Sequence, residues 1–180
     1  HSRIGDTNDA LLNFDCGVKE INDEIRSEIN DLEENKSKNR AILLVNKKGV
    51  VLGFVSYSLE NSSMIQASGE YGAKSVPVLN INLLGINNSD FNKGYGSQLV
   101  VAVIRMAKTI EVLVHIEAIQ LHSLEESVEF YEKLGFSEVR EYYPGRVNGS
   151  KMYYNIESLR DIDFLKVYVN PFLISDTANK

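Results

Sequence analysis

The chain has 180 residues, with 19 lysines and arginines against 25 aspartates and glutamates, and a formal net charge of -6 at pH 7. Hydrophobic residues make up 43% and charged residues 24%, as in ordinary globular domains, which excludes a disordered or collagen-like chain. This length suits one domain, so we expect residues 3–180 to form it, with residues 157–180 as a C-terminal addition. The acidic balance argues against a protein that coats nucleic acid.

The only cysteine is Cys16, so the chain has no internal disulfide and no cysteine pair for a zinc site, and we predict no bound metal. No apolar run approaches the roughly 20 residues that span a bilayer, and the first residues lack the apolar core of a secretory signal. These features predict a cytoplasmic protein without a membrane partner. A lone thiol is usually a small buried apolar residue, so we do not expect Cys16 to be a nucleophile.

The first half of the chain predicts a helix followed by three strands. Apolar residues recur every three or four positions between residues 15 and 36, which is typical of an amphipathic helix with a solvated acidic face. Two β-branched runs, 41–45 and 50–59, flank a polar turn and predict a hairpin. A third strand is predicted over 76–86, where apolar residues alternate with Asn80 and Asn82.

The second half predicts helices and strands in alternation. A turn-rich stretch leads from residue 87 into Gly94 and Gly96, after which apolar residues keep helical spacing. We predict a strand at about 117–122, a helix over 125–134 that ends at Gly135, and two closing strands over 136–143 and 151–156. The order predicts an α/β (α+β) domain whose central sheet is mixed, mostly antiparallel and flanked by helices.

A glycine pair between a strand and a helix is the outline of an anion site. Glycines let the backbone approach a ligand, and the free N–H groups of a helix start point at a phosphate. The turn is not a dinucleotide fingerprint, because Leu99 stands where the third glycine is needed, and no Gly-Lys pair of a P-loop follows. Taken alone, Gly94 and Gly96 are more often explained by the sterics of a tight turn.

A second motif, Phe-Tyr-Glu-Lys-Leu-Gly-Phe at residues 130–136, follows about 35 residues after the glycine turn. Together the two motifs resemble the GNAT superfamily of acyl-CoA-dependent N-acetyltransferases. The resemblance implies acetyl-CoA as co-substrate and Tyr131 beside the thioester sulfur as general acid. It implies that the strand end at Leu84, Gly85 and Ile86 pairs with the pantetheine arm. It also implies that the pyrophosphate lies on the backbone amides of a loop formed by Asn92, Lys93, Gly94, Tyr95, Gly96 and Ser97.

The chain departs from the usual family pattern at two positions near these motifs. Phe91 stands where members usually carry Gln or Arg near the phosphates, and Leu124 replaces an Asn that many members carry before the Tyr. Neither change removes a backbone amide. The resemblance therefore still implies cofactor binding by the loop.

Within the superfamily, the chain is most similar to toxin-type acetyltransferases of toxin–antitoxin pairs. The likeness rests on Phe-Asp-Cys-Gly at residues 14–17 followed by Ile21 and Asn22, on residues 76–78 and on residues 122–126. Those enzymes acetylate the amino group of aminoacyl-tRNA, which implies that acceptor and an antitoxin partner. The acidic net charge and Leu83, in the place of an Arg often found in these toxins, favour a different acceptor.

Acetyl transfer to an amine needs a neutral nucleophile, a polarised carbonyl and a proton for the departing thiolate. Backbone N–H groups at the end of the central strand suit the carbonyl oxygen. Tyr131 suits the proton, because a tyrosine with a pKa of about 10 keeps its proton at pH 7. The alternative is that Tyr131 only packs in the core beside Phe130 and Phe136.

The sequence leaves the general base open. Glu60, Glu117 and His122 could act through a water, whereas the amides of Asn80 and Asn82 cannot accept a proton at neutral pH. An α-amino group has a lower pKa than a lysine side chain and can react without a base, which favours an α-amine acceptor.

The first hypothesis is therefore an acetyl-CoA-dependent N-acetyltransferase that acts on a primary amine of a small molecule or peptide by direct attack. One alternative is a toxin that acetylates aminoacyl-tRNA and is bound by an antitoxin. Another is a non-catalytic acyl-CoA-binding domain. A homodimer is compatible with each of these.

Overall fold

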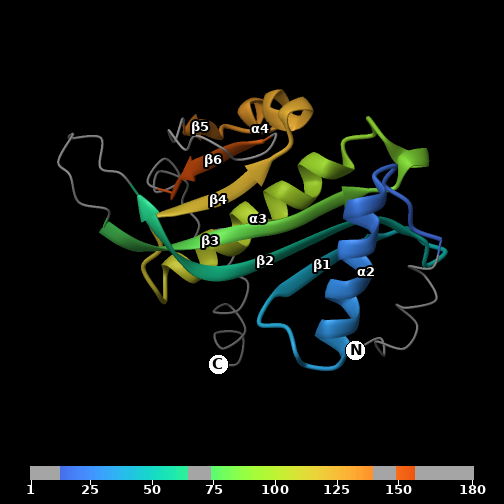
Figure 1. The fold of residues 1–180 in the computed structure, drawn as a ribbon, viewed down its shortest axis with the longest axis horizontal. Coiled ribbons are helices and arrows are strands. Elements are labelled where there is room, and N and C mark those ends of the chain that lie inside the picture. The colour runs from blue at the N-terminus through green and yellow to red at the C-terminus, as the bar shows by residue number, and fades with distance from the viewer. Residues whose placement is uncertain (1–12, 65–73, 140–148, 157–180) are drawn as a thin grey trace, which may run out of the picture.

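The computed structural model describes residues 13–64, 74–139 and 149–156. These ranges form a six-stranded sheet in the order β1-β2-β3-β4-β6-β5 (Figure 1). The strands are β1 Arg40–Val45, β2 Val51–Met64, β3 Lys74–Ile86, β4 Ala118–Ser123, β5 Ser137–Val139 and β6 Ser150–Asn155. The helices are α2 Lys19–Glu33, α3 Tyr95–Glu111 and α4 Val128–Lys133, with the 3-10 turns η1 Asn88–Asp90 and η2 Glu125–Ser127.

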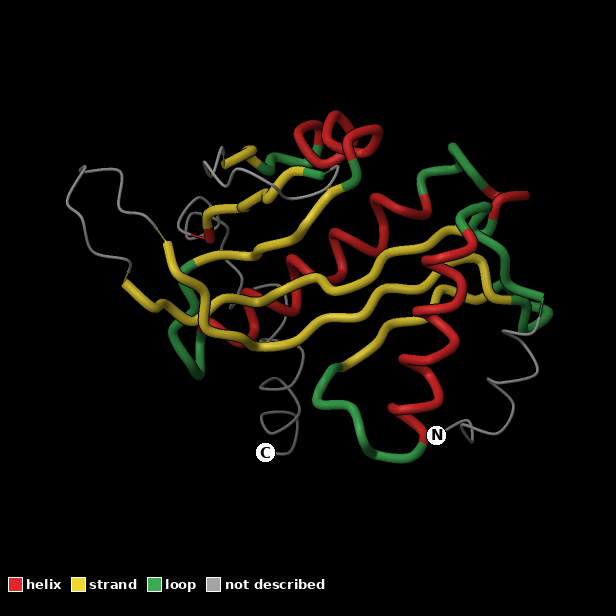
Figure 2. The backbone as a smooth tube through the Cα atoms, in the orientation of Figure 1, coloured by secondary structure: helices red, strands yellow, loops and turns green. Residues whose placement is uncertain are grey.

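The pairing of the strands confirms the predicted fold class. β1 and β2 form the predicted hairpin, and β2 pairs with β3 in antiparallel fashion along almost its whole length. Among the described strands, β3 and β4 are the parallel neighbours, and the remaining pairs are antiparallel. The sheet is thus mixed and mostly antiparallel, with helices on it (Figure 2).

Several predicted boundaries move. The helix predicted from residue 15 begins at Lys19, because residues 14–17 form a hydrogen-bonded turn in which Gly17 has a φ of 83°. The helix predicted over 125–134 opens with the 3-10 turn η2 before α4. Of the strand predicted over 136–143, only its beginning is described, as β5. The rest of that strand and the predicted addition at 157–180 lie outside the described residues.

Two apolar clusters hold helices on opposite faces of the sheet (Figure 1). The larger cluster lies between α3 and the sheet, and it includes Val55, Leu79, Ile81, Leu99, Val100, Val103, Ile119, Leu121 and Tyr131. The smaller cluster lies between α2 and the sheet and is formed by Phe14, Ile25, Ile29, Val51 and Phe54. α2 therefore contacts the C-terminal end of β3, whereas α3 begins near that end and runs along the opposite face of the sheet (Figure 1). No helix in the described ranges is long and apolar enough to cross a membrane.

Candidate active site

β3 and β4 separate part-way along their length. Their parallel pairing runs from Val78 opposite Ala118 to Ile81 opposite Leu121. Beyond this point β3 continues to Ile86 beside β2, whereas β4 remains paired with β6 (Figure 1). The last residues of β3 therefore have no strand partner on the β4 side in the described part of the chain. Backbone groups along such a free edge can pair with an extended ligand.

A β-bulge lies at the point of separation. Ser56 pairs with Leu83 and Tyr57 with Ile81, so Asn82 has no partner on β2. One extra residue reverses which side chains point to each face of the sheet. Before the bulge the side chain of Ile81 packs in the core beneath α3, and after the bulge the side chain of Leu84 does so. The bulge thus sets the orientation of the predicted pantetheine-binding residues at the end of β3.

The loop after β3 presents free backbone N–H groups at the start of α3. Gly94 caps the helix with a φ of 78°, and Asn92 before it also has a positive φ of 61°. The first helical bond runs from the N–H of Gln98 to the carbonyl of Gly94, at 3.1 Å. The N–H groups of residues 95–97 therefore have no acceptor within the described ranges. Together with the helix dipole they can hold an anion.

The two glycines of the loop serve different needs. No atom lies within 4 Å of a Cβ built on Gly94, so its positive φ is what requires glycine there. A Cβ on Gly96 would lie 3.2 Å from Cζ of Phe130 and 3.7 Å from Cγ1 of Ile86. The glycine turn, the end of β3 and the Phe-Tyr motif of α4 therefore meet at Gly96.

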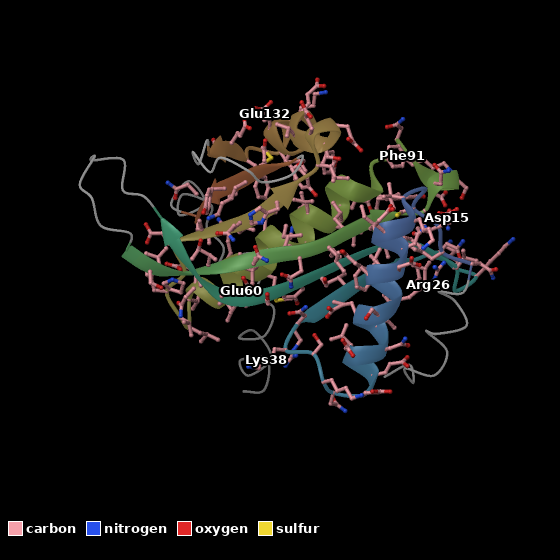
Figure 3. All side chains as sticks on the ribbon, viewed as in Figure 1. Asp15, Arg26, Lys38, Glu60, Phe91 and Glu132 are labelled. Atoms are coloured by element: carbon pink, nitrogen blue, oxygen red, sulfur yellow. The ribbon has the colours of Figure 1, made fainter. Side chains whose placement is uncertain are left out.

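The side chains of the loop contribute less than its backbone. The ammonium of Lys93 lies 2.7 Å from a carboxylate oxygen of Asp90. Hydrogen bonding within this pair raises the pKa of Lys93 and lowers the pKa of Asp90, so both stay charged at neutral pH. Phe91 is 60% exposed and offers no polar group to a phosphate (Figure 3). An anion bound here would share the Lys93 charge with Asp90.

Tyr131 lies on α4 and is 7% exposed. Its ring makes edge contacts with Phe130 and Phe136, with centroids 4.9 and 5.7 Å apart. Burial raises the pKa of the Tyr131 hydroxyl, which therefore keeps its proton far above neutral pH. No described residue forms a hydrogen bond with this hydroxyl. A protonated hydroxyl without a hydrogen-bond partner among the described residues is a potential donor to a bound ligand.

The face of the sheet opposite α3 carries a row of hydrogen-bonded polar side chains. The amide of Gln120 donates to Oδ1 of Asn80 at 3.1 Å, and the amide of Asn80 donates to Asn82. Asn82 donates to Oγ of Ser58 at 3.0 Å, and Ser58 donates to the exposed Glu60 at 2.6 Å (Figure 3). The row crosses β4, β3 and β2 where β3 and β4 separate, so Asn80 and Asn82 share a face, as predicted.

The structure separates the three candidates for the general base. Glu117 precedes β4 and pairs with His115, with Nε2 and Oε2 3.3 Å apart. At about 3.3 Å per residue, it lies about 13 Å along the strand from Leu121, where β4 leaves β3. Glu117 therefore lies away from the point where the two strands separate. His122 follows Leu121, is exposed, and by strand alternation shares the polar face with Gln120 and Glu60.

The comparison with protein families decides the identity. A sequence model of the acetyltransferase (GNAT) family matches residues 10–136, which include β3, the glycine loop and Tyr131. The chain belongs to the acetyltransferase (GNAT) family. The predicted enzyme class and GNAT-like fold are thereby confirmed.

Solved structures similar to this GNAT chain include toxins of toxin–antitoxin systems. A bacterial toxin matches with a TM-score of 0.71 and 21% identity, over 82% of this chain and 83% of that chain. AtaT complexed with acetyl-methionyl-tRNAfMet matches with a TM-score of 0.69 and 20% identity, over 83% of this chain and 89% of that chain. A third similar structure is a Tyr-to-Phe mutant of the toxin AtaT bound to the C-terminus of the antitoxin AtaR and to acetyl-CoA. It matches with a TM-score of 0.68 and 23% identity, over 83% of this chain and 87% of that chain. No curated protein matches the chain.

Two features of this GNAT site were missed in the sequence. One is the bulge at Asn82. The polar residues within an otherwise apolar strand are only a weak sequence signal for it. The other is the position of residues 14–17, which carry the toxin resemblance but lie far from the two motifs in sequence. They contact the loop after β3 through a bond from the N–H of Asn88 to the carbonyl of Asp15. The signal for this position is Asn22, a polar residue buried in the first turns of α2.

Proposed function

We propose that this GNAT protein transfers an acetyl group from acetyl-CoA to a primary amine by direct attack, with Tyr131 as general acid. The observation that carries the proposal is the contact of Phe130 with Gly96, which brings the Tyr131 motif against the anion-binding loop. The structure of AtaT with bound acetyl-CoA supports this co-substrate. The cytoplasm is the location we propose for the protein.

The described residues fit the parts of acetyl-CoA assigned to them. The free amides of residues 95–97 suit the pyrophosphate, and the open space around Gly94 leaves room for it. The free edge of β3 at Leu84, Gly85 and Ile86 suits the peptide-like pantetheine arm, whose amides can pair with a strand. When bound, acetyl-CoA supplies the activated acetyl group.

The chemistry asks for one proton to leave the attacking nitrogen and one to reach the departing sulfur, as the N–C bond forms and the C–S bond breaks. Tyr131 holds the second proton because burial raises the pKa of its hydroxyl. The same apolar surroundings disfavour an unprotonated thiolate, which helps the sulfur to take that proton. Backbone N–H groups near the bulge at Asn82 stabilise charge on the carbonyl oxygen.

The first proton leaves towards the polar face of the sheet. Glu60 and His122 are exposed there and can receive it through water. Because this route runs through water, an acceptor that is already neutral reacts best. This reasoning favours an α-amino group over a lysine side chain as acceptor.

The test measures CoA thiol release from acetyl-CoA with a panel of α-amines, peptides and polyamines. Tyr131→Phe should lower kcat about 100-fold or more, with little change in KM for acetyl-CoA. The matched control is Tyr57→Phe, because Tyr57 is equally buried in the same core cluster but lies on β2. Equal kcat values for wild type and Tyr131→Phe would remove Tyr131 from the mechanism. CoA binding without turnover of any amine would favour the non-catalytic acyl-CoA-binding domain.

A tRNA-directed toxin is the second candidate function. The similar fold of AtaT bound to acetyl-methionyl-tRNAfMet favours it, as does the Phe-Asp-Cys-Gly motif at residues 14–17. The net charge of -6 works against an RNA acceptor. A translation extract supplied with acetyl-CoA and the protein should stall if this function is right, and Tyr131→Phe should relieve the stall. If protein synthesis in the extract continues undiminished with the protein in excess, the toxin function is ruled out. The proposed antitoxin partner is then ruled out as well.

A further inference from the structure

Residues 14–17 form a turn that the buried side chain of Asn22 holds together. Oδ1 of Asp15 accepts hydrogen bonds from the N–H of Gly17 at 2.8 Å and from the amide of Asn22 at 2.7 Å. Oδ1 of Asn22 accepts the N–H of Cys16 at 2.9 Å. Asn22 is 7% exposed, so its amide group is almost fully used inside the protein. These bonds also lower the pKa of Asp15, which stays ionised at neutral pH.

The same turn contacts both halves of the proposed cofactor site. The carbonyl of Asp15 accepts the N–H of Asn88, the first residue of η1, at 2.7 Å. A Cβ on Gly17 would lie 3.5 Å from Cγ of Asn88, so the turn also lies against that side chain. A Cβ on Gly85 would lie 3.3 Å from Cζ of Phe14. The turn is thus in contact with the end of β3 and with the loop that leads to Gly94.

The loop depends on this contact because it has few others. Residues 87–94 are mostly exposed, and most of their backbone hydrogen bonds stay inside the loop, apart from the one that the carbonyl of Gly94 accepts from Gln98 at the start of α3. Within the described ranges, two backbone bonds tie residues 87–93 to the rest of the protein. One joins the N–H of Asn87 to the carbonyl of Leu52 at 2.9 Å, and the other joins Asn88 to Asp15. Loss of the second leaves the start of the loop held by the bond to β2 alone.

We propose that Asn22 is a positioning residue for the anion-binding loop, acting through Asp15 and Asn88. The inference rests on the proposed function, because it assigns the loop to the pyrophosphate of acetyl-CoA. Backbone amides bind an anion well only when they are already in place, since ordering a mobile loop on binding costs affinity. Asn22 fixes the carbonyl of Asp15, and that carbonyl fixes the start of the loop.

The first test is Asn22→Ala, which removes both hydrogen bonds of the amide. We expect it to raise the Kd for CoA and the KM for acetyl-CoA about tenfold, with kcat changed less than about twofold. Amide hydrogen exchange at residues 88–94 should become faster without any ligand, while exchange in β2 and β3 stays unchanged. The matched control is Asn30→Ala, because Asn30 is an exposed asparagine on the same helix.

The second test exchanges the amide and the carboxylate. Asn22→Asp alone sets a second carboxylate against Asp15 and should weaken CoA binding more than Asn22→Ala does. The double variant Asp15→Asn/Asn22→Asp restores the bond from the N–H of Cys16 and lets the amide of residue 15 donate to the carboxylate of residue 22, although the N–H of Gly17 then loses its acceptor. It should therefore recover part, but not all, of the CoA affinity that Asn22→Asp alone loses. This exchange keeps the proposal testable where Asn22→Ala does not fold.

The outcomes separate the positioning role from the proposed function. If wild type binds CoA and a folded Asn22→Ala variant binds CoA equally well, Asn22 does not position the loop. A folded double variant that binds no better than Asn22→Asp alone also overturns the role of Asn22. Wild type that does not bind CoA refutes the proposed function itself, and the role of Asn22 falls with it.

Discussion

The ring of Phe130 lies over Gly96, with Cζ 3.2 Å from the position that a Cβ on Gly96 would take. Gly96 lies in the first turn of α3 and Phe130 lies on α4, so this contact joins two motifs that are far apart in the chain. Because the ring of Phe130 also contacts Tyr131, the spacing between the anion-binding loop and the proposed acid depends on the missing side chain of residue 96.

Gly96→Ala should therefore damage catalysis through Phe130. A methyl group at 3.2 Å forces the ring to move by a few tenths of an ångström, and overpacking of this kind costs about 1 to 3 kcal/mol. We expect lower thermal stability and a lower kcat as Tyr131 follows the ring. The double variant Gly96→Ala/Phe130→Leu should recover part of the lost stability. If Gly96→Ala keeps the thermal stability and the kcat of wild type, the ring of Phe130 can move aside without cost and the prediction is wrong.

Gly94→Ala should weaken CoA binding, and the chain offers a matched control in Gly49→Ala. Both glycines have positive φ, 78° and 79°, and both have open space around the Cβ position. Each alanine should cost about 1 kcal/mol of stability because the left-handed backbone disfavours a side chain. Only Gly94 caps the helix of the proposed pyrophosphate site. Isothermal titration with CoA should show a raised Kd for Gly94→Ala alone, and equal losses for both would contradict the site.

Alkaline pH should destabilise the protein in part through Tyr131. Burial raises the pKa of its hydroxyl in the folded state, whereas the unfolded chain titrates at about 10. Above that pH the unfolded state binds fewer protons than the folded state, so stability falls with rising pH, by up to about 1.4 kcal/mol per pH unit for one group. Urea unfolding at a series of pH values should show that the free energy of unfolding falls less steeply with pH in Tyr131→Phe than in wild type. A slope equal to that of wild type would mean that the hydroxyl titrates freely when folded.

His115 should titrate above its ordinary range. Hydrogen bonds to Glu111, at 3.1 Å, and to Glu117, at 3.3 Å, raise the pKa of His115. The stabilisation is present below the unfolded pKa of about 6.5 and is lost as pH rises through the folded value. NMR titration should show a lower pKa for His115 in Glu117→Gln than in wild type. Glu125→Gln, which changes an exposed acid outside this cluster, should leave the His115 titration as it was.

Much of the fold follows from local patterns in the sequence. The spacing of Ile25 and Ile29, the alternation that reaches Leu79 and Ile81, and the glycine turn at Gly94 each predict an element that the structure contains. These signals are local because helix periodicity, strand alternation and positive φ depend on a few neighbouring residues. Tyr131 and the glycine loop could be chosen from their motifs for the same reason.

The arrangement of the site depends on contacts between distant segments. The separation of β3 from β4 and the bulge at Asn82 arise from pairing with strands that come before and after β3 in the chain. Pairing of β2, β3 and β4 also brings Glu60 and His122 to the same face of the sheet. The bond from Asn88 to Asp15 joins residues between which α2 and the strands β1, β2 and β3 lie in the sequence. The sequence by itself determined which residues could bind an anion and donate a proton, because that is set by residue type and local backbone. Only the tertiary structure decided which of them meet, because strand register and helix packing bring distant residues together.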